Sequence, residues 1–402
     1  MNPYLVYLIL SFTSSLIFSL IFTVNLLYHV TVVELSPLQL VLVGTILETS
    51  VFLFEVPTGV VADVKSRRLS IVIGYLLIGV GFVVEGALPM FGFVALSQVI
   101  WGLGYTFTSG ATQAWIADEI GEQRVGNAFI RGAQAARIGS LVAIPISVAL
   151  GMVAIQVPIV TGGGLMIVLA LFLSLAMTES GFSPEPLEQR TPWVLMLKTI
   201  GDARRLIRRQ PVLLALLAIG FFYGLYSEGF DRLWAAHLLE NFTLPGIDLV
   251  EPVIWFGLIR AVSLVASLAA TEVARRSVDT SQALPIVRVL LFNAAGIVLA
   301  LLGFALAQNF WVAIALYWLV GALRGMGEPL QTAWYNLLID DPHVRATLFS
   351  VGGQVDAVGQ IAGGPAVGAI GNVSLRMALS VSALILSPVL PLYVVSWRRS
   401  LD

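Results

Sequence analysis

Long apolar stretches separated by short polar connections run along almost the whole chain. A membrane-spanning helix needs about 20 mostly apolar residues, and twelve stretches meet this requirement. They are 4–31, 37–61, 69–88, 91–115, 128–151, 156–177, 211–238, 252–273, 284–306, 310–338, 346–370 and 374–396. The pattern therefore predicts an all-α integral membrane protein with 12 transmembrane helices.

One polar connection is much longer than the others and divides the spans into two sets of six. It covers 178–210, with Pro184, Pro186, Pro192 and a run of arginines. We therefore expect an N-terminal six-helix bundle at 1–177, a central loop at 178–210 and a C-terminal six-helix bundle at 211–402.

The two sets of spans also resemble each other in sequence. At an offset of 220 residues, the segment from 129 to 151 matches the segment from 349 to 371 at several positions. The matched pairs include Phe129/Phe349, Gln134/Gln354, Gly139/Gly359, Pro145/Pro365 and Gly151/Gly371. Two parallel six-helix repeats are the arrangement that alternating access requires, since one half rocks against the other around a central site.

The basic residues indicate the orientation of the spans. Of the 22 Lys and Arg residues, 17 lie in or close to connections after even-numbered spans or at the C-terminus, four lie deeper within spans, and only Arg376 lies close to a connection on the opposite side. Cytoplasmic connections of membrane proteins carry the excess of Lys and Arg. We therefore expect both termini and the central loop in the cytoplasm of a cell membrane protein.

Composition excludes several classes of protein. Of 402 residues, 58% are hydrophobic and 11% are charged, against about 25% charged residues in soluble domains. There is no cysteine, and the three histidines are His29, His237 and His343, so neither a thiolate metal site nor a plausible catalytic set is present. We expect a monomer that is not an enzyme and that has no cofactor, metal or nucleic-acid partner.

The connection after the second span carries a motif, Pro-Thr-Gly-Val-Val-Ala-Asp-Val-Lys-Ser-Arg-Arg at 57–68. It resembles the cytoplasmic loop signature of the major facilitator superfamily at Gly59, Asp63, Arg67 and Arg68, whereas Val64 and Ser66 depart from it. The resemblance implies close helix packing at Gly59 and a latch in which Asp63 caps the helix beginning near Val344–Thr347. Asp118 or Glu119 is expected to pair with Arg67 or Arg68.

Within the superfamily the chain is most similar to the drug and tetracycline proton antiporters, the multidrug efflux branch associated with antibiotic resistance. One subgroup of tetracycline exporters carries glutamates in spans two and three, as Glu48, Glu55 and Glu85 do here. Two antiporter signatures are incomplete. Gln98 stands where span four would carry Arg, and only Pro145 remains of the span-five motif.

Ten charged residues inside the predicted spans are candidates for function, because an ionisable group there is costly and usually faces a wet cavity. We predict proton coupling by Glu48, Glu55, Glu228, Asp231, Arg324, Glu328 and Asp356. The others are Glu85, Arg137 and Arg260. Structural alternatives remain open: Glu48 paired with Arg137 or Arg324, Asp231 with Arg232 or Arg260, Arg324 clamped to Asp356, and Glu85 reaching the headgroups. His237 is expected at the membrane interface.

Polar and aromatic residues at mid-depth are candidates to bind a substrate, because aromatic faces suit flat, hydrophobic or cationic ligands. The candidates are Asn25, Gln113, Tyr223, Tyr226, Gln331, Trp334, Tyr335 and Gln354. The leading interpretation is a proton-coupled exporter of amphipathic drugs, tetracycline-like compounds among them. The alternative is a proton-coupled importer of a small organic acid or sugar.

Overall fold

The computed structural model describes residues 1–184, 211–246, 251–339 and 342–399, with the backbone alone at 211–212, 342–347, 350 and 398–399. Every regular element in these ranges is an α-helix, and eleven helical segments are long and apolar enough to cross a membrane. The predicted eleventh span is the 30-residue helix α14, Pro342–Gly371. This helix is not among the eleven apolar segments, because its glycines and the polar Gln354, Asp356 and Gln360 lower its mean hydropathy.

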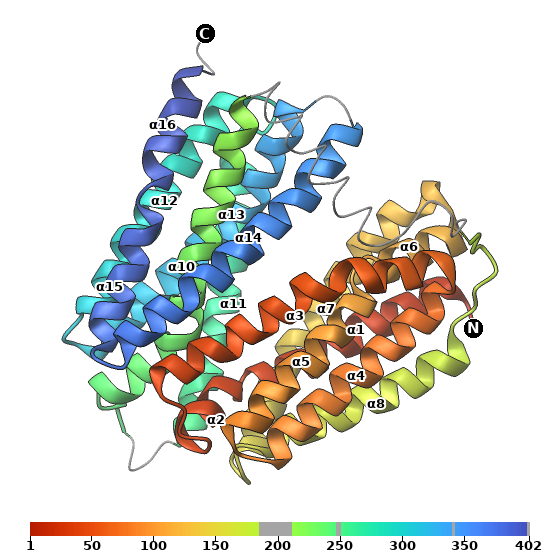
Figure 1. Cartoon of the computed structure of the whole chain (residues 1–402), viewed down its shortest axis with the longest axis horizontal. Helices are drawn as coiled ribbons and strands as arrows, with labels where there is room; N and C mark the ends of the chain where they lie inside the picture. The colour runs from red at the N-terminus through yellow and green to blue at the C-terminus, as the bar shows by residue number, and fades with distance from the viewer. Residues whose placement is uncertain (185–210, 247–250, 340–341, 400–402) are drawn as a thin grey trace. The chain divides into compact units, whose positions relative to one another are not determined.

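The helices form two compact units. Unit 1 comprises Met1–Leu35, Ile46–Met196 and Val250–Gly257. Its helices are α1 Pro3–Phe22, α2 Asn25–Thr31, most of α3 Pro37–Val64, α4 Arg67–Ala87, α5 Phe91–Thr108, α6 Ala111–Ile120, α7 Glu122–Gly151 and α8 Val157–Ala176. Within it, α1 packs along α7, and α4 lies between α5 and α8 (Figure 1).

Unit 2 comprises Ser36–Thr45, Leu197–Leu249 and Leu258–Asp402. Its helices are α10 Pro211–Asn241, most of α11 Pro252–Ser277, α12 Ala283–Leu306, α13 Phe310–Leu338, α14, α15 Leu375–Leu386 and α16 Val389–Arg399. Here α10 packs along α14, and α12 contacts α13, α15 and α16. The second and eighth spans, α3 and α11, each contribute residues to both units. The predicted division at 177 and 211 instead assigns each span to one bundle only.

The sequence repeat is visible in the packing of each unit. A Cβ atom on Gly139 of α7 would lie 2.3 Å from the Phe12 carbonyl oxygen of α1. A Cβ atom on Gly359 of α14 would lie 2.4 Å from the Phe221 carbonyl oxygen of α10. Small residues let membrane helices approach closely, so these equivalent glycines set the same helix contact in both repeats.

Local chemistry explains where several helices begin. The side chains of Asn2, Ser66 and Ser374 accept hydrogen bonds from backbone N–H groups in the first turns of α1, α4 and α15, which satisfies donors that a helix leaves unpaired. Proline stands at the first position of α3, α10, α11 and α14, where its missing N–H costs nothing.

Three predicted spans are interrupted, contrary to the sequence interpretation. Span one breaks between Phe22 and Asn25, next to Thr23, whose hydroxyl donates to the Ser19 carbonyl oxygen at 2.6 Å; such bonds bend helices. Span four breaks at Gly110, with φ +70°, and then continues to Ile120, because glycine tolerates positive φ. Span twelve divides between Leu386 and Val389, on either side of Pro388, which cannot donate a helical hydrogen bond.

Of the predicted central loop at 178–210, residues 185–210 lie outside the described ranges. The described beginning, 178–184, lies against α6 in unit 1. The Trp115 indole N–H donates to the Thr178 carbonyl oxygen at 2.7 Å. The Glu119 carboxylate accepts from the Thr178 hydroxyl and from the Ser180 and Gly181 backbone at 2.6 to 2.8 Å. These bonds tie the end of the sixth span to α6.

Candidate functional site

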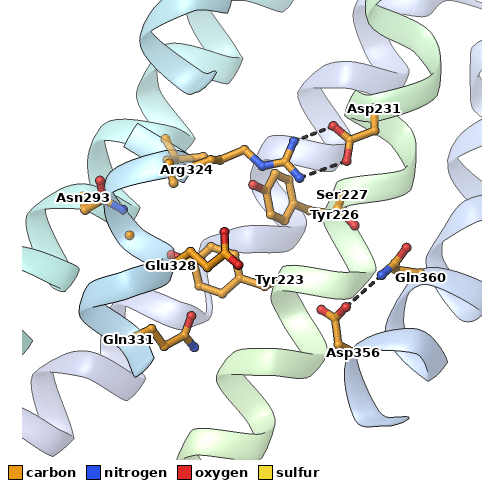
Figure 2. A pocket seen from close by; sticks show the side chains of 13 residues that line it. Tyr223, Tyr226, Ser227, Asp231, Asn293, Arg324, Glu328, Gln331, Asp356 and Gln360 are labelled. Atoms are coloured by element: carbon orange, nitrogen blue, oxygen red, sulfur yellow. Dashed lines mark hydrogen bonds and ion pairs between the residues drawn. The ribbon is translucent and has the colours of Figure 1, made fainter. Parts of the chain in front are cut away.

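A polar cavity of about 410 Å³ lies among α10, α12, α13 and α14 of unit 2 (Figure 2). Its lining includes ten residues with polar or charged side chains: Tyr223, Tyr226, Ser227, Asp231, Asn293, Arg324, Glu328, Gln331, Asp356 and Gln360. Helical periodicity explains this concentration, because residues three, four or seven apart share a face. On α13 the lining residues Arg324, Glu328 and Gln331 follow that spacing, as do Asp356 and Gln360 on α14.

A proline shapes α13 at the cavity. Pro329 lies inside this helix and therefore cannot donate the usual hydrogen bond to the carbonyl oxygen of Gly325, four residues earlier. The Thr271 hydroxyl of α11 is shared between that oxygen, at 3.0 Å, and the Ser267 carbonyl oxygen of its own helix, at 2.9 Å. A neighbouring threonine thus offers a donor to a backbone acceptor that would be costly to leave unpaired in a membrane, and α13 stays continuous between Arg324 and Gln331.

The central charged contact is a two-pronged ion pair. Arg324 donates to both carboxylate oxygens of Asp231, at 2.5 and 2.9 Å. The guanidinium also lies 5.8 Å from the ring centres of Tyr226 and Phe230, within cation–π range. This corrects two structural alternatives: the ion-pair partner of Asp231 is neither Arg232 nor Arg260, and the partner of Arg324 is not Asp356.

Two more carboxylates line the cavity. Asp356 accepts a 2.8 Å hydrogen bond from the Gln360 amide one turn later on α14. Glu328 lies one turn from Arg324 on α13, and its side chain is directed into the cavity in Figure 2. A Cβ atom on Gly224 of α10 would lie 2.1 Å from the Asp356 carbonyl oxygen, so this glycine allows α14 to bring Asp356 against α10.

A second cavity of about 330 Å³ adjoins the first and has a mainly apolar lining that includes Leu216, Leu348 and Phe349. Four residues line both cavities: Tyr223, Glu328, Gln331 and Asp356. Tyr335 also lines the second cavity, and its hydroxyl accepts from the Gln331 amide at 2.6 Å. A polar compartment and an apolar compartment therefore meet at two carboxylates.

The predicted substrate-binding residues divide into those at the cavities and those elsewhere. Tyr223, Tyr226, Gln331 and Tyr335 line one or both cavities. Trp334 is buried in the helix packing beside Tyr393, and Gln113 is exposed on α6. Gln354 belongs to α14 but is not among the lining residues of either cavity, and Asn25 belongs to a separate buried cluster. Sequence reasoning missed Asn293, Ser227 and Gln360.

The predicted proton-coupling residues outside the cavity lie in two places. Glu228 of α10 is buried and accepts from Arg232 at 3.3 Å. A Cβ atom on Gly44 of α3 would lie 1.8 Å from a Glu228 carboxylate oxygen, so Gly44 leaves the space that this pair occupies. Glu48 and Glu55 belong to the part of α3 in unit 1, within electrostatic reach of Tyr105 on α5.

Glu85 is the centre of a buried hydrogen-bond cluster in unit 1, contrary to the expectation that it reaches the headgroups. The side chain is 0% exposed. One carboxylate oxygen accepts from Asn25 at 2.5 Å and from His29 Nε2 at 2.9 Å. The other accepts from Ser97 at 2.7 Å and from Gln98 at 2.9 Å. The cluster joins α2, α4 and α5, and Tyr28 adds a bond from its hydroxyl to the Glu85 carbonyl oxygen at 2.7 Å.

Two further positions differ from their expected surroundings. His237, expected at the membrane interface, is 0% exposed, and its Nε2 atom lies 3.2 Å from the Phe304 carbonyl oxygen. The His237 ring also packs against the Phe304 ring of α12. This contact buries His237 away from the lipid. Arg137, an alternative partner for Glu48, is exposed on α7.

The loop motif between α3 and α4 is held by contacts within unit 1. Arg67 forms the expected ion pair with Asp118 and lies 5.7 Å from the Phe182 ring centre. The guanidinium of Arg68 donates to the Ser174 carbonyl oxygen, and its backbone N–H donates to Glu179 at 3.0 Å. The latch expected between Asp63 and the start of the helix near Val344–Thr347 stays a prediction, because the side chains of that segment lie outside the described residues.

The close packing expected at Gly59 is not found. A Cβ atom there would meet nothing within 4 Å in the described part of the chain. Gly59 is only half-buried on α3; the close contacts lie instead at glycines such as Gly139 and Gly359.

Membrane-spanning helices around an internal polar cavity, in two repeated units, define the class of polytopic solute transporters. The sequence profile of the Major Facilitator Superfamily matches residues 4–364, and the chain belongs to this family. The chain is 22% identical over 339 residues to the uncharacterized MFS-type transporter YxaM of Bacillus subtilis (strain 168), covering 83% of this chain and 80% of that protein.

Solved structures share the same fold. The nucleoside transporter NupG matches with a TM-score of 0.76 at 15% identity, covering 98% of this chain and 99% of that chain. A bacterial homolog of the human lysosomal transporter Spinster, in an inward-facing and unoccupied conformation, matches with a TM-score of 0.73 at 16% identity, covering 99% and 97%. At these identities the likeness establishes the fold alone.

The Arg67–Asp118 pair lies outside the cavity, so its loss should affect transport and ligand binding differently. We expect Asp118→Asn to lower the initial transport rate several-fold, because Arg67 loses its charged partner at the loop motif. Ligand binding to purified protein should stay unchanged. Transport into liposomes and ligand-induced thermal shifts measure the two effects. Asp279→Asn, at an exposed position between α11 and α12, is the control. Weakened ligand binding in Asp118→Asn would contradict a role of the Arg67–Asp118 pair in transport alone.

Proposed function

We propose that the protein is a proton-coupled secondary transporter that exports amphipathic organic cations, tetracycline-like drugs among them, by alternating access. The observation that carries this proposal is the cavity of unit 2, where Asp231, Glu328 and Asp356 accompany one arginine, Arg324. Ionisable side chains in membrane spans generally mark a pathway for ions, protons or substrate. The acidic excess favours a cationic solute.

The paired cavities support an amphipathic solute. Tyr223 and Tyr226 offer aromatic faces beside the carboxylates, and aromatic faces attract organic cations. The adjoining cavity offers Leu216, Leu348 and Phe349 to an apolar group. A solute with a charged end and an apolar end would thus be matched to both compartments.

The carboxylates also support coupling to protons. Glu328 and Asp356 line both compartments, so a bound cation would compete with protons for the same negative charges, as exchange requires. We propose that these two residues carry the exchanged proton. Glu48, Glu55, Glu228 and the Asp231–Arg324 pair would respond to the conformational change. In this proposal the protein acts as a monomer in the cell membrane, with both termini in the cytoplasm.

A second candidate function is uptake of a small polar solute such as a sugar, an organic acid or a nucleoside. The observation that favours it is the number of amides at the first cavity, namely Asn293, Gln331 and Gln360. Amides offer both donors and acceptors to hydroxyl or base groups. Here protons and solute would move in the same direction.

The proposed function is tested with purified protein in liposomes that enclose a pH-sensitive dye. Under an imposed proton gradient we expect tetracycline and cationic dyes to trigger proton movement opposite to the solute, whereas sugars, organic acids and nucleosides trigger none. Asp356→Asn should reduce this movement at least about tenfold, because the loss of one charged group's interactions is worth more than 1.4 kcal/mol. Glu240→Gln, exposed at the end of α10, is the matched control.

Three other results of this experiment would each contradict one part of the proposed function. Proton movement triggered only by polar solutes, in the direction of the solute, would replace export by uptake. Full coupling in both Asp356→Asn and Glu328→Gln would remove these residues from the proton pathway. Transport without proton movement for any compound would contradict proton coupling itself.

A further inference from the structure

Asn293 is a buried amide at the cavity wall that has no hydrogen-bond partner among the described residues. Its side chain is 2% exposed, and both its Oδ1 and Nδ2 atoms are unpaired. It lies on α12, in a segment where its neighbours Phe292, Ala294 and Ala295 are apolar. The sequence therefore places one strong polar group in the middle of a span whose surrounding residues, 289–306, are otherwise apolar.

An unpaired amide in this position costs stability. Most buried polar side chains have a hydrogen-bond partner, and those without one call for an explanation. The cost is larger in a membrane-spanning helix, because lipid offers no replacement partner. An apolar side chain at 293, such as leucine with the same branching at Cγ, would avoid the cost, so packing alone does not explain the asparagine.

The neighbouring helix leaves room for the amide. A Cβ atom on Gly327 of α13 would lie 2.7 Å from Asn293 Nδ2, so this glycine accommodates the amide at the wall. Figure 2 shows Asn293 on α12 beside the α13 segment that carries Arg324 and Glu328. Since the terminal torsion of an asparagine is soft, the amide can rotate from Gly327 into the cavity without a change in the backbone.

We propose that Asn293 is a specificity residue that binds a neutral donor or acceptor group of the transported solute, such as a carboxamide. The proposal rests on the proposed export of organic cations and adds a chemical requirement to it. The cation lies with the carboxylates of Glu328 and Asp356, and the carboxamide N–H donates to Asn293 Oδ1. The solute then satisfies an acceptor that the protein leaves unpaired.

A matched pair of probes tests this requirement. Procainamide and procaine share an aromatic amine and a tertiary ammonium group, and they differ in an amide N–H against an ester oxygen. We expect the wild-type protein to bind procainamide about tenfold more tightly, which is the usual effect of leaving one buried partner unsatisfied. Ligand-induced thermal stabilisation of the purified full chain measures both affinities.

Two substitutions separate binding from a structural role. Asn293→Leu should abolish the preference for procainamide and also raise the Tm of the unliganded protein by about 2–4 °C, because an unpaired polar group is replaced by an apolar one. Gly327→Ala should weaken the preference by displacing the amide. Phe292→Leu, on the exposed face of α12, should keep it.

Each other outcome contradicts the proposal in a distinguishable way. A lower Tm for Asn293→Leu would make Asn293 a structural residue. Equal binding of both amines by wild-type protein would remove the carboxamide requirement and leave cation export standing. If neither amine binds and no cation of the liposome panel moves protons, the proposed function fails together with the inference that rests on it.

Discussion

Glu85→Leu is expected to be the most destabilising single substitution in unit 1. Glu85 accepts hydrogen bonds from Asn25, His29, Ser97 and Gln98. Leucine would leave the Asn25 amide and His29 Nε2 buried without this acceptor, whereas Ser97 and Gln98 keep the Val94 carbonyl oxygen. Each buried donor or acceptor that loses its partner costs about 1–3 kcal/mol, and more where the partner is charged. At about 2–4 °C per kcal/mol for a unit of this size, the Tm should fall by roughly 10 °C or more in detergent.

The graded variant Glu85→Gln distinguishes the hydrogen bonds from side-chain volume. Glutamine keeps the shape, but its NH₂ group faces donors where a carboxylate oxygen accepted, so an intermediate loss is expected. Glu122→Gln, exposed at the start of α7, should leave the Tm unchanged. If Glu85→Leu unfolds at the wild-type temperature, this cluster does not hold α2 against α4 and α5.

The long spans were predictable from the sequence because each depends only on the number of consecutive apolar residues. The breaks inside them were not. The interruption at Thr23 depends on one side-chain bond to Ser19, and the interruption at Gly110 depends on a positive φ. A hydropathy window averages over such single-residue features, and glycine and threonine are common in uninterrupted membrane helices as well.

The charged residues of the site were also predictable, whereas their partners were not. Apolar surroundings identify an ionisable residue inside a span, but its partner depends on how neighbouring helices are rotated. Asp231 and Arg232 are adjacent in the sequence and face different neighbours, Arg324 and Glu228. For Glu85, depth along the span left a position at the headgroups open. Its burial follows from donors on α2 and α5 that no local pattern connects to it.

The second large effect is expected at the Asp231–Arg324 pair. Asp231→Asn and Arg324→Gln should each reduce transport about tenfold or more, because hydrogen bonds between charged groups contribute about 1.5–3 kcal/mol. Both side chains are partly open to the cavity, at 42% and 33% exposure, so each remaining charge would alter the field that a solute meets. Proton-driven transport in liposomes and Tm in detergent measure the two consequences.

The double variant Asp231→Asn/Arg324→Gln decides whether the pair is a clamp or part of transport. Neutralising both residues removes the uncompensated charge, so much of the Tm lost in either single variant should return. Transport should stay low, because the double variant lacks Arg324. A bound cation can then no longer displace Arg324 from Asp231. Recovery of transport with Tm would show that the pair only holds α10 to α13. If instead the ion pair must break and re-form in every transport cycle, the double variant should regain its Tm but not its transport activity.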